Sequence, residues 1–244
     1  ESINQLAAGL QKNGFKKGDV LAIYSPNLPE YVVVFLAVLK LGGICTTVNP
    51  LYTAQELAKQ LSDANAKIIV TVSAFLDKAK TATQTHAVQE IIVIDSETEY
   101  RNLKGLMQAN HELSEPSISP KEDLCALPYS SGTTGLPKGV MLTHHNLIMN
   151  MRQTEGMTSH NAISEKDTVL GVLPFFHIYG MVVIMLYTLY RRGTIVCMSR
   201  FDMEDFLGAI QTHKVTKAPI VPPIVLGLAK HPAVEQFDLS SLEL

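Results

Sequence analysis

Two patterns of apolar and polar residues alternate along this chain. Short continuous apolar runs predict strands that are buried on both faces. These runs cover residues 20–24, 44–48, 67–72, 90–94, 124–129, 140–142, 168–173, 194–199 and 217–221. Between the runs lie stretches that predict helices, several with apolar residues at every third or fourth position. The helices are expected at residues 3–12, 27–41, 53–64, 74–82, 100–109, 144–156, 179–191, 202–213 and 222–230.

Regular alternation of strands and helices indicates an α/β fold. We expect layered, mostly parallel sheets with helices on both faces, because a parallel strand pair needs a crossover connection. The polar stretch 114–120 contains two prolines and is the best candidate for a linker. A first sheet is expected within residues 15–167. A second, incomplete sheet is expected within residues 168–244, together with helix 1–14.

Composition restricts the classes of function. The chain has 244 residues, 46% of them hydrophobic, and a net charge of −3 with acidic and basic residues intermixed, so no nucleic-acid partner is indicated. Its three cysteines are far apart in apolar runs and predict buried thiols in a reducing compartment. The first residues lack a methionine and the pattern of a signal peptide, so the chain reads as one that starts within a longer protein.

Residues 168–190 contain no Asp, Glu, Lys or Arg and are long enough to cross a bilayer. Pro174, His177 and Gly180 interrupt this stretch, and the charges that flank it show no clear asymmetry. A strand, a loop and a buried helix explain it better than a membrane span, although a membrane protein remains an alternative at this stage.

One polar stretch stands between two of the predicted strands. Residues 129–139 read Tyr-Ser-Ser-Gly-Thr-Thr-Gly-Leu-Pro-Lys-Gly, with four Ser and Thr hydroxyls, three glycines and a lysine. Glycine lets backbone N–H groups approach a ligand, and successive N–H groups form a concave site for anions. Hydroxyls add donors and Lys138 adds positive charge, a combination that suits a polyphosphate. The spacing is not that of a Walker A loop.

A second group of candidate residues follows the predicted strand 168–173. His177 lies between Phe176 and Tyr179, and Gly180 comes next. Ligands of open α/β sheets bind beyond the carboxyl ends of the strands, so His177 stands at a plausible site. On residue type alone, a histidine in an apolar context is more often part of the core.

These two stretches resemble motifs of one known family. Residues 129–140 resemble the phosphate-binding signature of the adenylate-forming superfamily, and Met141-Leu142-Thr143-His144 is most similar to its 4-coumarate-CoA ligase and luciferase branch. Residues 173–181 resemble the second core motif of the same branch. Further similar stretches, such as Asn49-Pro50-Leu51-Tyr52 and Val221-Pro222-Pro223, extend the resemblance over essentially the whole chain.

The resemblance implies a role for each matching residue. In the family, the loop holds the phosphates of ATP, one of its hydroxyls stands near Mg²⁺, and the histidine orients the carboxylate of the acid. Tyr179 and Gly180 would line the acyl pocket, and Arg200 would lie near coenzyme A. His177 and Lys138 would be the catalytic residues, and Thr133 or Thr134 the Mg²⁺ neighbour. The expected ATP-binding residues are Ser130, Ser131, Gly132, Thr133, Thr134, Gly135 and Lys138.

The implied activity is the ATP-dependent activation of an aromatic or fatty carboxylic acid to an acyl-adenylate, with release of pyrophosphate, followed by thioester formation with coenzyme A. The chain would be part of an AMP-binding N-terminal domain, without the C-terminal domain and its catalytic lysine, and alone it would be inactive. Alternatives are a luciferase-like monooxygenase and a non-catalytic nucleotide-binding relative. A cytoplasmic or peroxisomal location is expected. The identity of the acid and the oligomeric state are open.

Overall fold

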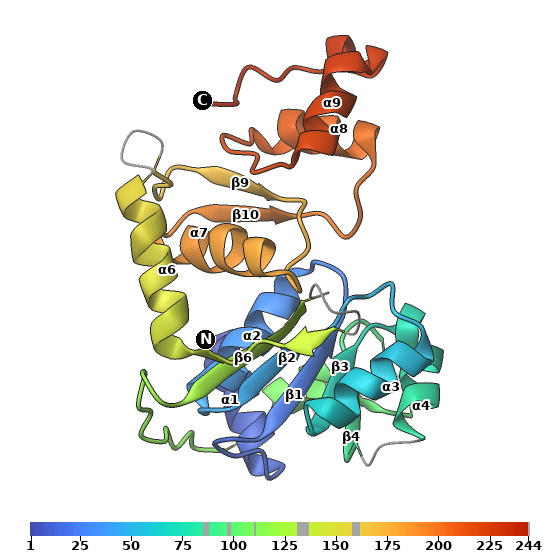
Figure 1. Cartoon of the computed structure of the whole chain (residues 1–244), viewed down its shortest axis with the longest axis vertical. Helices are drawn as coiled ribbons and strands as arrows, with labels where there is room; N and C mark the ends of the chain where they lie inside the picture. The colour runs from blue at the N-terminus through green and yellow to red at the C-terminus, as the bar shows by residue number, and fades with distance from the viewer. Residues whose placement is uncertain (85–87, 97–98, 110, 131–136, 158–161, 244) are drawn as a thin grey trace. The chain divides into compact units, whose positions relative to one another are not determined.

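The computed structural model describes residues 1–84, 88–96, 99–109, 111–130, 137–157 and 162–243 (Figure 1). By its internal contacts the chain divides into two compact units. The first unit comprises Glu1–Ser25 and Pro29–Leu147, and the second comprises Pro26–Leu28 and Ile148–Leu244.

The first unit contains one large sheet. Its strands are β1 (Val20–Tyr24), β2 (Ile44–Thr47), β3 (Ala66–Thr71), β4 (Glu90–Val93), β5 (Arg101–Asn102), β6 (Leu124–Ser130), β7 (Lys138–Gly139) and β8 (Leu142–Thr143). They are ordered β5-β4-β3-β1-β2-β6-β7, and β8 also pairs with β6. The pairs from β5 to β6 are parallel, whereas β7 and β8 are both antiparallel to β6. The mostly parallel α/β sheet expected from the sequence is therefore confirmed.

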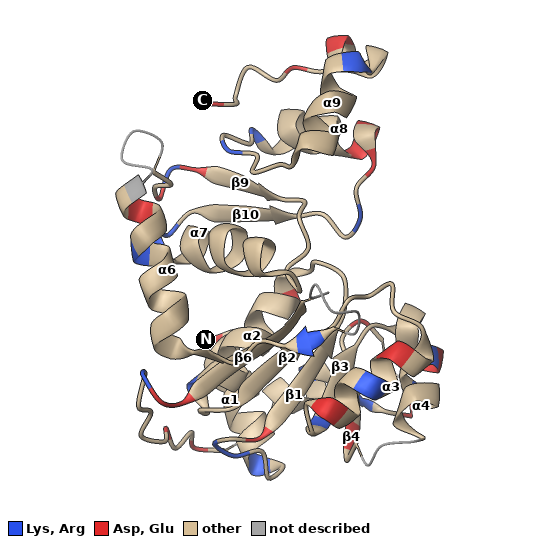
Figure 2. Cartoon of the chain, viewed as in Figure 1, with Lys and Arg blue, Asp and Glu red and all other residues tan. Residues whose placement is uncertain are grey.

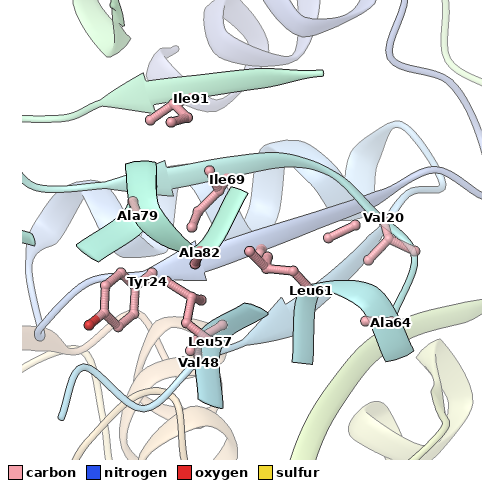
Figure 3. Close-up of a cluster of buried hydrophobic side chains, with 12 residues drawn as sticks. Val20, Tyr24, Val48, Leu57, Leu61, Ala64, Ile69, Ala79, Ala82 and Ile91 are labelled. Carbon is pink, nitrogen blue, oxygen red and sulfur yellow. The ribbon is translucent and has the colours of Figure 1, made fainter. Parts of the chain in front are cut away.

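Helices cover both faces of this sheet. They are α1 (Ser2–Lys12), α2 (Pro29–Lys40), α3 (Ala54–Asp63), the short 3-10 helix η1 (Ser73–Phe75), α4 (Leu76–Thr83) and α5 (Leu103–Met107). Figure 3 shows Val20 and Tyr24 of β1 in a buried cluster with Leu57 and Leu61 of α3 and Ala79 and Ala82 of α4. Ala22 of β1 belongs to the same cluster. Side chains alternate along a strand, so Leu21 and Ile23, also fully buried, face the other layer.

The N-terminal helix differs from its expected place. We expected helix 1–14 to join the second sheet, but α1 packs against α2 and α5 in the first unit, where Leu6 and Leu10 are buried. The boundary between the units also falls at residues 147 and 148, inside the helix α6 (His144–Met157), rather than at residue 167. Amphipathic spacing marks which face of α1 is buried but carries no information on which layer covers it.

The second unit contains a small parallel sheet and most of the C-terminal helices. Strands β9 (Thr168–Gly171) and β10 (Thr194–Cys197) pair in register from Thr168 and Thr194 to Gly171 and Cys197. The π-helix η2 (Tyr179–Leu186) and α7 (Tyr187–Tyr190) connect them. After β10 come α8 (Met203–His213), α9 (Pro222–Lys230) and the 3-10 helix η3 (Pro232–Gln236). Figure 2 shows no acidic or basic residue on β9 or β10, and β9 is the more buried of the two strands.

Three expected elements differ in detail. The strand expected at 217–221 is only an isolated bridge between Val169 and Lys217, since Pro219 has no N–H to donate to a ladder. Of the strand expected at 140–142, only Leu142 lies in a strand, β8, and β7 comes before it. The helix expected at 100–109 begins only at Leu103, because Asn102 caps it by accepting a hydrogen bond from the N–H of Gly105.

Among the residues that the structure describes, no helix has the length and apolar character needed to cross a membrane. The stretch 168–190 instead forms β9, a turn, η2 and α7, the strand, loop and helix favoured from the sequence.

Candidate functional site

Strands β6 and β7 form the stem of the predicted phosphate loop. Tyr129 pairs with Gly139 and Ser130 with Lys138 in an antiparallel register, so the two ends of the loop lie opposite each other. The side chains of Ser130 and Lys138 are exposed. Of the predicted ATP-binding residues, Ser131, Gly132, Thr133, Thr134 and Gly135 lie outside the described residues. Their roles, and the role of Thr133 or Thr134 beside Mg²⁺, stay predictions.

Tyr129 joins this stem to helix α3. Its hydroxyl donates a hydrogen bond to the carboxylate of Asp63, the last residue of α3. Burial, followed by this hydrogen bond, raises the pKa of Tyr129 well above its usual value. A Cβ atom added at Gly139 would lie 3.2 Å from the Tyr129 ring, so any larger residue at position 139 would require the ring to shift by a few tenths of an ångström. Sequence reasoning gave Tyr129 no role, because its partner lies 66 residues away.

A cavity of about 520 Å³ opens beside the stem, within the first unit. Its wall combines two tyrosines, two lysines and two carboxylates with a buried amide, from Tyr52, Glu56, Lys59, Gln60, Asp63, Tyr129, Pro137, Lys138 and Gly139. The carboxylate of Glu56 accepts hydrogen bonds from the N–H and the hydroxyl of Thr53, and these bonds lower its pKa. Lys138 is therefore shared between the loop stem and a hollow of mixed charge that the sequence did not reveal.

His177 lies in the turn between β9 and η2 of the second unit, and its imidazole is exposed. Its backbone N–H donates to the carbonyl of Pro174 (3.1 Å), and its carbonyl accepts from the N–H of Met181 (2.8 Å). The Nδ1 atom of its ring accepts a hydrogen bond from the N–H of Tyr179 (3.3 Å). A backbone N–H is always the donor, so a neutral His177 carries its proton on Nε2 and can donate it to an anionic oxygen.

Gly180 is required by the shape of the same turn. A Cβ atom there would lie 2.0 Å from the carbonyl oxygen of Pro174, far inside contact distance. The close approach lets η2 begin directly after His177, with Phe175 fully buried beneath the turn and Tyr179 half-buried. The substrate-binding roles expected of Tyr179 and Gly180 stay predictions, and the packing gives Gly180 a structural role as well.

Asn27 holds this turn from a distant part of the chain. Its Nδ2 atom donates to the carbonyls of Gly171 (3.0 Å) and Leu173 (2.9 Å), and its Oδ1 atom accepts from the N–H of Phe175 (2.8 Å). From the sequence, Asn27 was the first residue of the helix expected at 27–41, which begins at Pro29 in the structure. No local pattern could have indicated partners 144 to 148 residues away.

The expected coenzyme A residue lies at the same end of the small sheet. Arg200 is exposed and follows β10, just before Asp202, whose side chain caps α8 by accepting from the N–H groups of Glu204 and Asp205. Because β9 and β10 are parallel, the His177 turn and Arg200 both follow the carboxyl ends of paired strands. This edge of the second unit therefore carries the residues predicted to contact the acyl group and coenzyme A. The predicted phosphate-binding residues Ser130 and Lys138 belong to the first unit.

A family model and a curated relative both indicate an AMP-binding enzyme. The model of the AMP-binding enzyme family matches residues 1–244. 4-Coumarate–CoA ligase 2 of Nicotiana tabacum is 45% identical over 241 residues, which are 98% of this chain and 44% of that ligase. The chain therefore spans less than half the length of that relative.

Solved structures agree with the fold. A long-chain-fatty-acid-CoA ligase from Archaeoglobus fulgidus superposes with a TM-score of 0.90 at 29% identity, over 100% of this chain and 48% of that one. A red-emitting luciferase from Phrixothrix hirtus superposes with a TM-score of 0.88 at 28% identity, over 99% of this chain and 48% of that one. With a family match over the full sequence and the same fold in both structures, this chain belongs to the AMP-binding enzyme family.

Proposed function

We propose that the complete protein carrying this chain is an acid–thiol ligase that activates a carboxylic acid with ATP and passes the acyl group to coenzyme A. The observation that carries this proposal is the geometry of His177. Its Nδ1 atom is occupied by the N–H of Tyr179, which leaves a donor at Nε2. The imidazole is exposed at the carboxyl end of a parallel strand, where α/β proteins bind ligands.

The first step would join a carboxylate oxygen to the α-phosphorus of ATP, while the bond from that phosphorus to the β-phosphate oxygen breaks and pyrophosphate leaves. Both reactants are anions, so the protein must position them and offset their charge. The residues 130–138 would hold the β- and γ-phosphates, with Lys138 supplying positive charge. His177 would donate from Nε2 to the acid and to the charge that develops beside it.

Mg²⁺ would neutralise phosphate charge in this step, and the hydroxyl of Thr133 or Thr134 would be its protein neighbour, since Mg²⁺ prefers oxygen ligands. In the second step the sulfur of coenzyme A would attack the acyl carbon and AMP would leave. Tyr179 and Gly180 would line the acyl pocket, and Arg200 would contact coenzyme A. The similarity to 4-coumarate–CoA ligase favours an aromatic acid, and that to the archaeal ligase favours a fatty acid.

The similarity to the Phrixothrix luciferase favours a second candidate, an oxygenase that would also adenylate an acid first. Oxygen-dependent light emission with a luciferin would support it. Thioester formed with coenzyme A, and no light, would support the ligase.

The proposal is tested by ATP binding and by ATP–pyrophosphate exchange with hydroxycinnamic and fatty acids, using the complete protein. We expect acid-dependent exchange, and we expect Lys138→Ala combined with Thr133→Ala to abolish ATP binding. Lys230→Ala is the matched control, because Lys230 is exposed at the end of α9 and should leave binding unchanged. Unchanged ATP binding in the double variant would refute the loop assignment, and exchange catalysed by residues 1–244 alone would refute the expectation that they are inactive by themselves.

A further inference from the structure

The turn that carries His177 is held by a buried side-chain amide. Only 5% of the surface of Asn27 is exposed, and its amide bonds the backbone of three residues of the second unit: Gly171, Leu173 and Phe175. Both N–H donors and the carbonyl oxygen of the amide are therefore used. The two carbonyl acceptors fix which end of the amide carries nitrogen, so the orientation of the side chain is determined by its partners.

The backbone segment that Asn27 holds is hydrogen-bonded to His177. Leu173 and Phe175, the last two of the three backbone partners of Asn27, flank Pro174. The Pro174 carbonyl accepts the N–H of His177 at 3.1 Å. The Nδ1 atom of His177 then accepts the N–H of Tyr179. The peptide group between Pro174 and Phe175 thus links the two residues, because its N–H donates to Asn27 and its carbonyl accepts from the N–H of His177.

We propose that Asn27 is a positioning residue for His177: its amide fixes the turn from Gly171 to His177, and thereby the place at which Nε2 meets the acid. This inference rests on the role proposed for His177 above. Asparagine suits the position because it donates and accepts at once. An aspartate would set its charge against two carbonyl oxygens, and an apolar residue would remove all three hydrogen bonds, leaving the Gly171 carbonyl with the N–H of Met198 (3.1 Å).

The first test measures the protection of the backbone amides in the turn and does not depend on enzymatic activity. Amide hydrogen exchange of Phe175 and His177 is measured in the complete protein and in Asn27→Ala. The Phe175 N–H loses its bond to Asn27, and the turn that holds the Pro174 carbonyl against the His177 N–H loses its support, so we expect exchange at both amides to accelerate by about tenfold or more. If Asn27→Ala does not fold, Asn27→Ser, which keeps one donor, takes its place with a smaller expected acceleration.

Thr216→Ala is the matched control. Thr216 accepts a hydrogen bond from the N–H of Thr168 (3.1 Å) and donates to Asp167 (2.7 Å), so it holds the opposite end of the same strand. In Thr216→Ala, the exchange rates of the Phe175 and His177 amides should stay within about twofold of those in the parent. Unchanged exchange in the Asn27 variants, or equal acceleration in Thr216→Ala, would overturn the proposal.

The second test asks whether Asn27 acts through His177, by a double-mutant cycle in the rate of acyl-adenylate formation. Since misplacement of a catalytic group by about 1 Å can cost about 100-fold, we expect Asn27→Ser to lower kcat by about 10- to 100-fold with the KM for ATP nearly unchanged. In a His177→Ala background the same change should cost less than about twofold, whereas the cost of Thr216→Ala should be the same in both backgrounds.

Costs of Asn27→Ser and His177→Ala that multiply in full would overturn the positioning role. A protein that forms no acyl-adenylate with any acid would instead refute the proposed function. In that case the exchange measurement would still decide whether Asn27 holds the turn and the His177 amide in place.

Discussion

The hydroxyl of Tyr129 donates a hydrogen bond to the carboxylate of Asp63, which ties the stem of the phosphate loop to the end of helix α3. We expect Tyr129→Phe to lower the free energy of unfolding by about 1 kcal/mol, because it removes this bond and leaves the ring against Gly139 in place. Urea denaturation measures the change. Tyr190→Phe is the control, since Tyr190 is 52% exposed and its change should stay within about 0.5 kcal/mol. Equal stability of Tyr129→Phe and the parent would show that the bond adds nothing.

The contact between Gly180 and Pro174 predicts a large effect of a single methyl group. Gly180→Ala would place a Cβ atom 2.0 Å from the Pro174 carbonyl oxygen, so the turn must move. We expect a loss of about 1–3 kcal/mol in the free energy of unfolding, as for other overpacked sites, and a loss of activity beyond what stability explains.

A glycine in open space supplies the comparison for that change. Around Gly156, near the end of helix α6, nothing lies within 4 Å of an added Cβ. Gly156→Ala should therefore stabilise the protein slightly, by up to about 1 kcal/mol, through helix propensity. Thermal unfolding and initial rates of both variants are measured side by side, and a Gly180→Ala enzyme with parental rates would contradict the assignment of this turn to the site.

Asp167 predicts a dependence of stability on pH. Burial raises its pKa, but hydrogen bonds from the hydroxyl of Thr216 and from the hydroxyl and N–H of Ser164 outweigh burial, and the net pKa is lowered. A lowered pKa in the folded state means that the carboxylate stabilises the fold above its unfolded pKa of about 3.9. That contribution is lost as the pH falls through the folded value.

Asp167→Asn should thus cost about 1.5–3 kcal/mol near pH 7, the usual range for hydrogen bonds to a charged group. The difference from the parent should shrink below about pH 4. Denaturation curves collected from pH 7 to pH 3 provide the measurement. Glu235 is an exposed carboxylate on η3, so the stability difference between Glu235→Gln and the parent should not change with pH. A stability difference for Asp167→Asn that stays constant with pH would show that the charge of the carboxylate is not its cause.

The parts of the fold that could be predicted are those whose partners are close in the sequence. Thr53 and Glu56 predict a capping box by their spacing, and both of its hydrogen bonds are present. Asp202 likewise caps the helix expected after it. Hydropathy placed most strands within two residues, but it was wrong for 217–221, where a missing N–H at Pro219 outweighs apolar character.

The sequence predicted the residues of the candidate site better than the residues that hold them in place by hydrogen bonds. His177 was expected after a strand and lies there, yet the Asn27 amide that holds its turn and the Asp63 carboxylate bound to Tyr129 had no sequence signal. Both contacts join residues far apart in the chain, and periodicity reports only on local geometry. The π-helical form of η2 was missed for a related reason, since its apolar residues also fit an α-helix.

Asn27 also bears on the order in which the protein acquires its structure. Residues 26–28 belong to the second unit, although the chain on both sides of them belongs to the first. During synthesis this amide cannot meet its native partners until residues 171–175 have been made, because they are 144 to 148 positions later. Contacts of such long range form slowly, so the histidine turn is expected to be completed late in folding. A truncated second unit starting at residue 148 would lack this amide and with it the three hydrogen bonds to Gly171, Leu173 and Phe175.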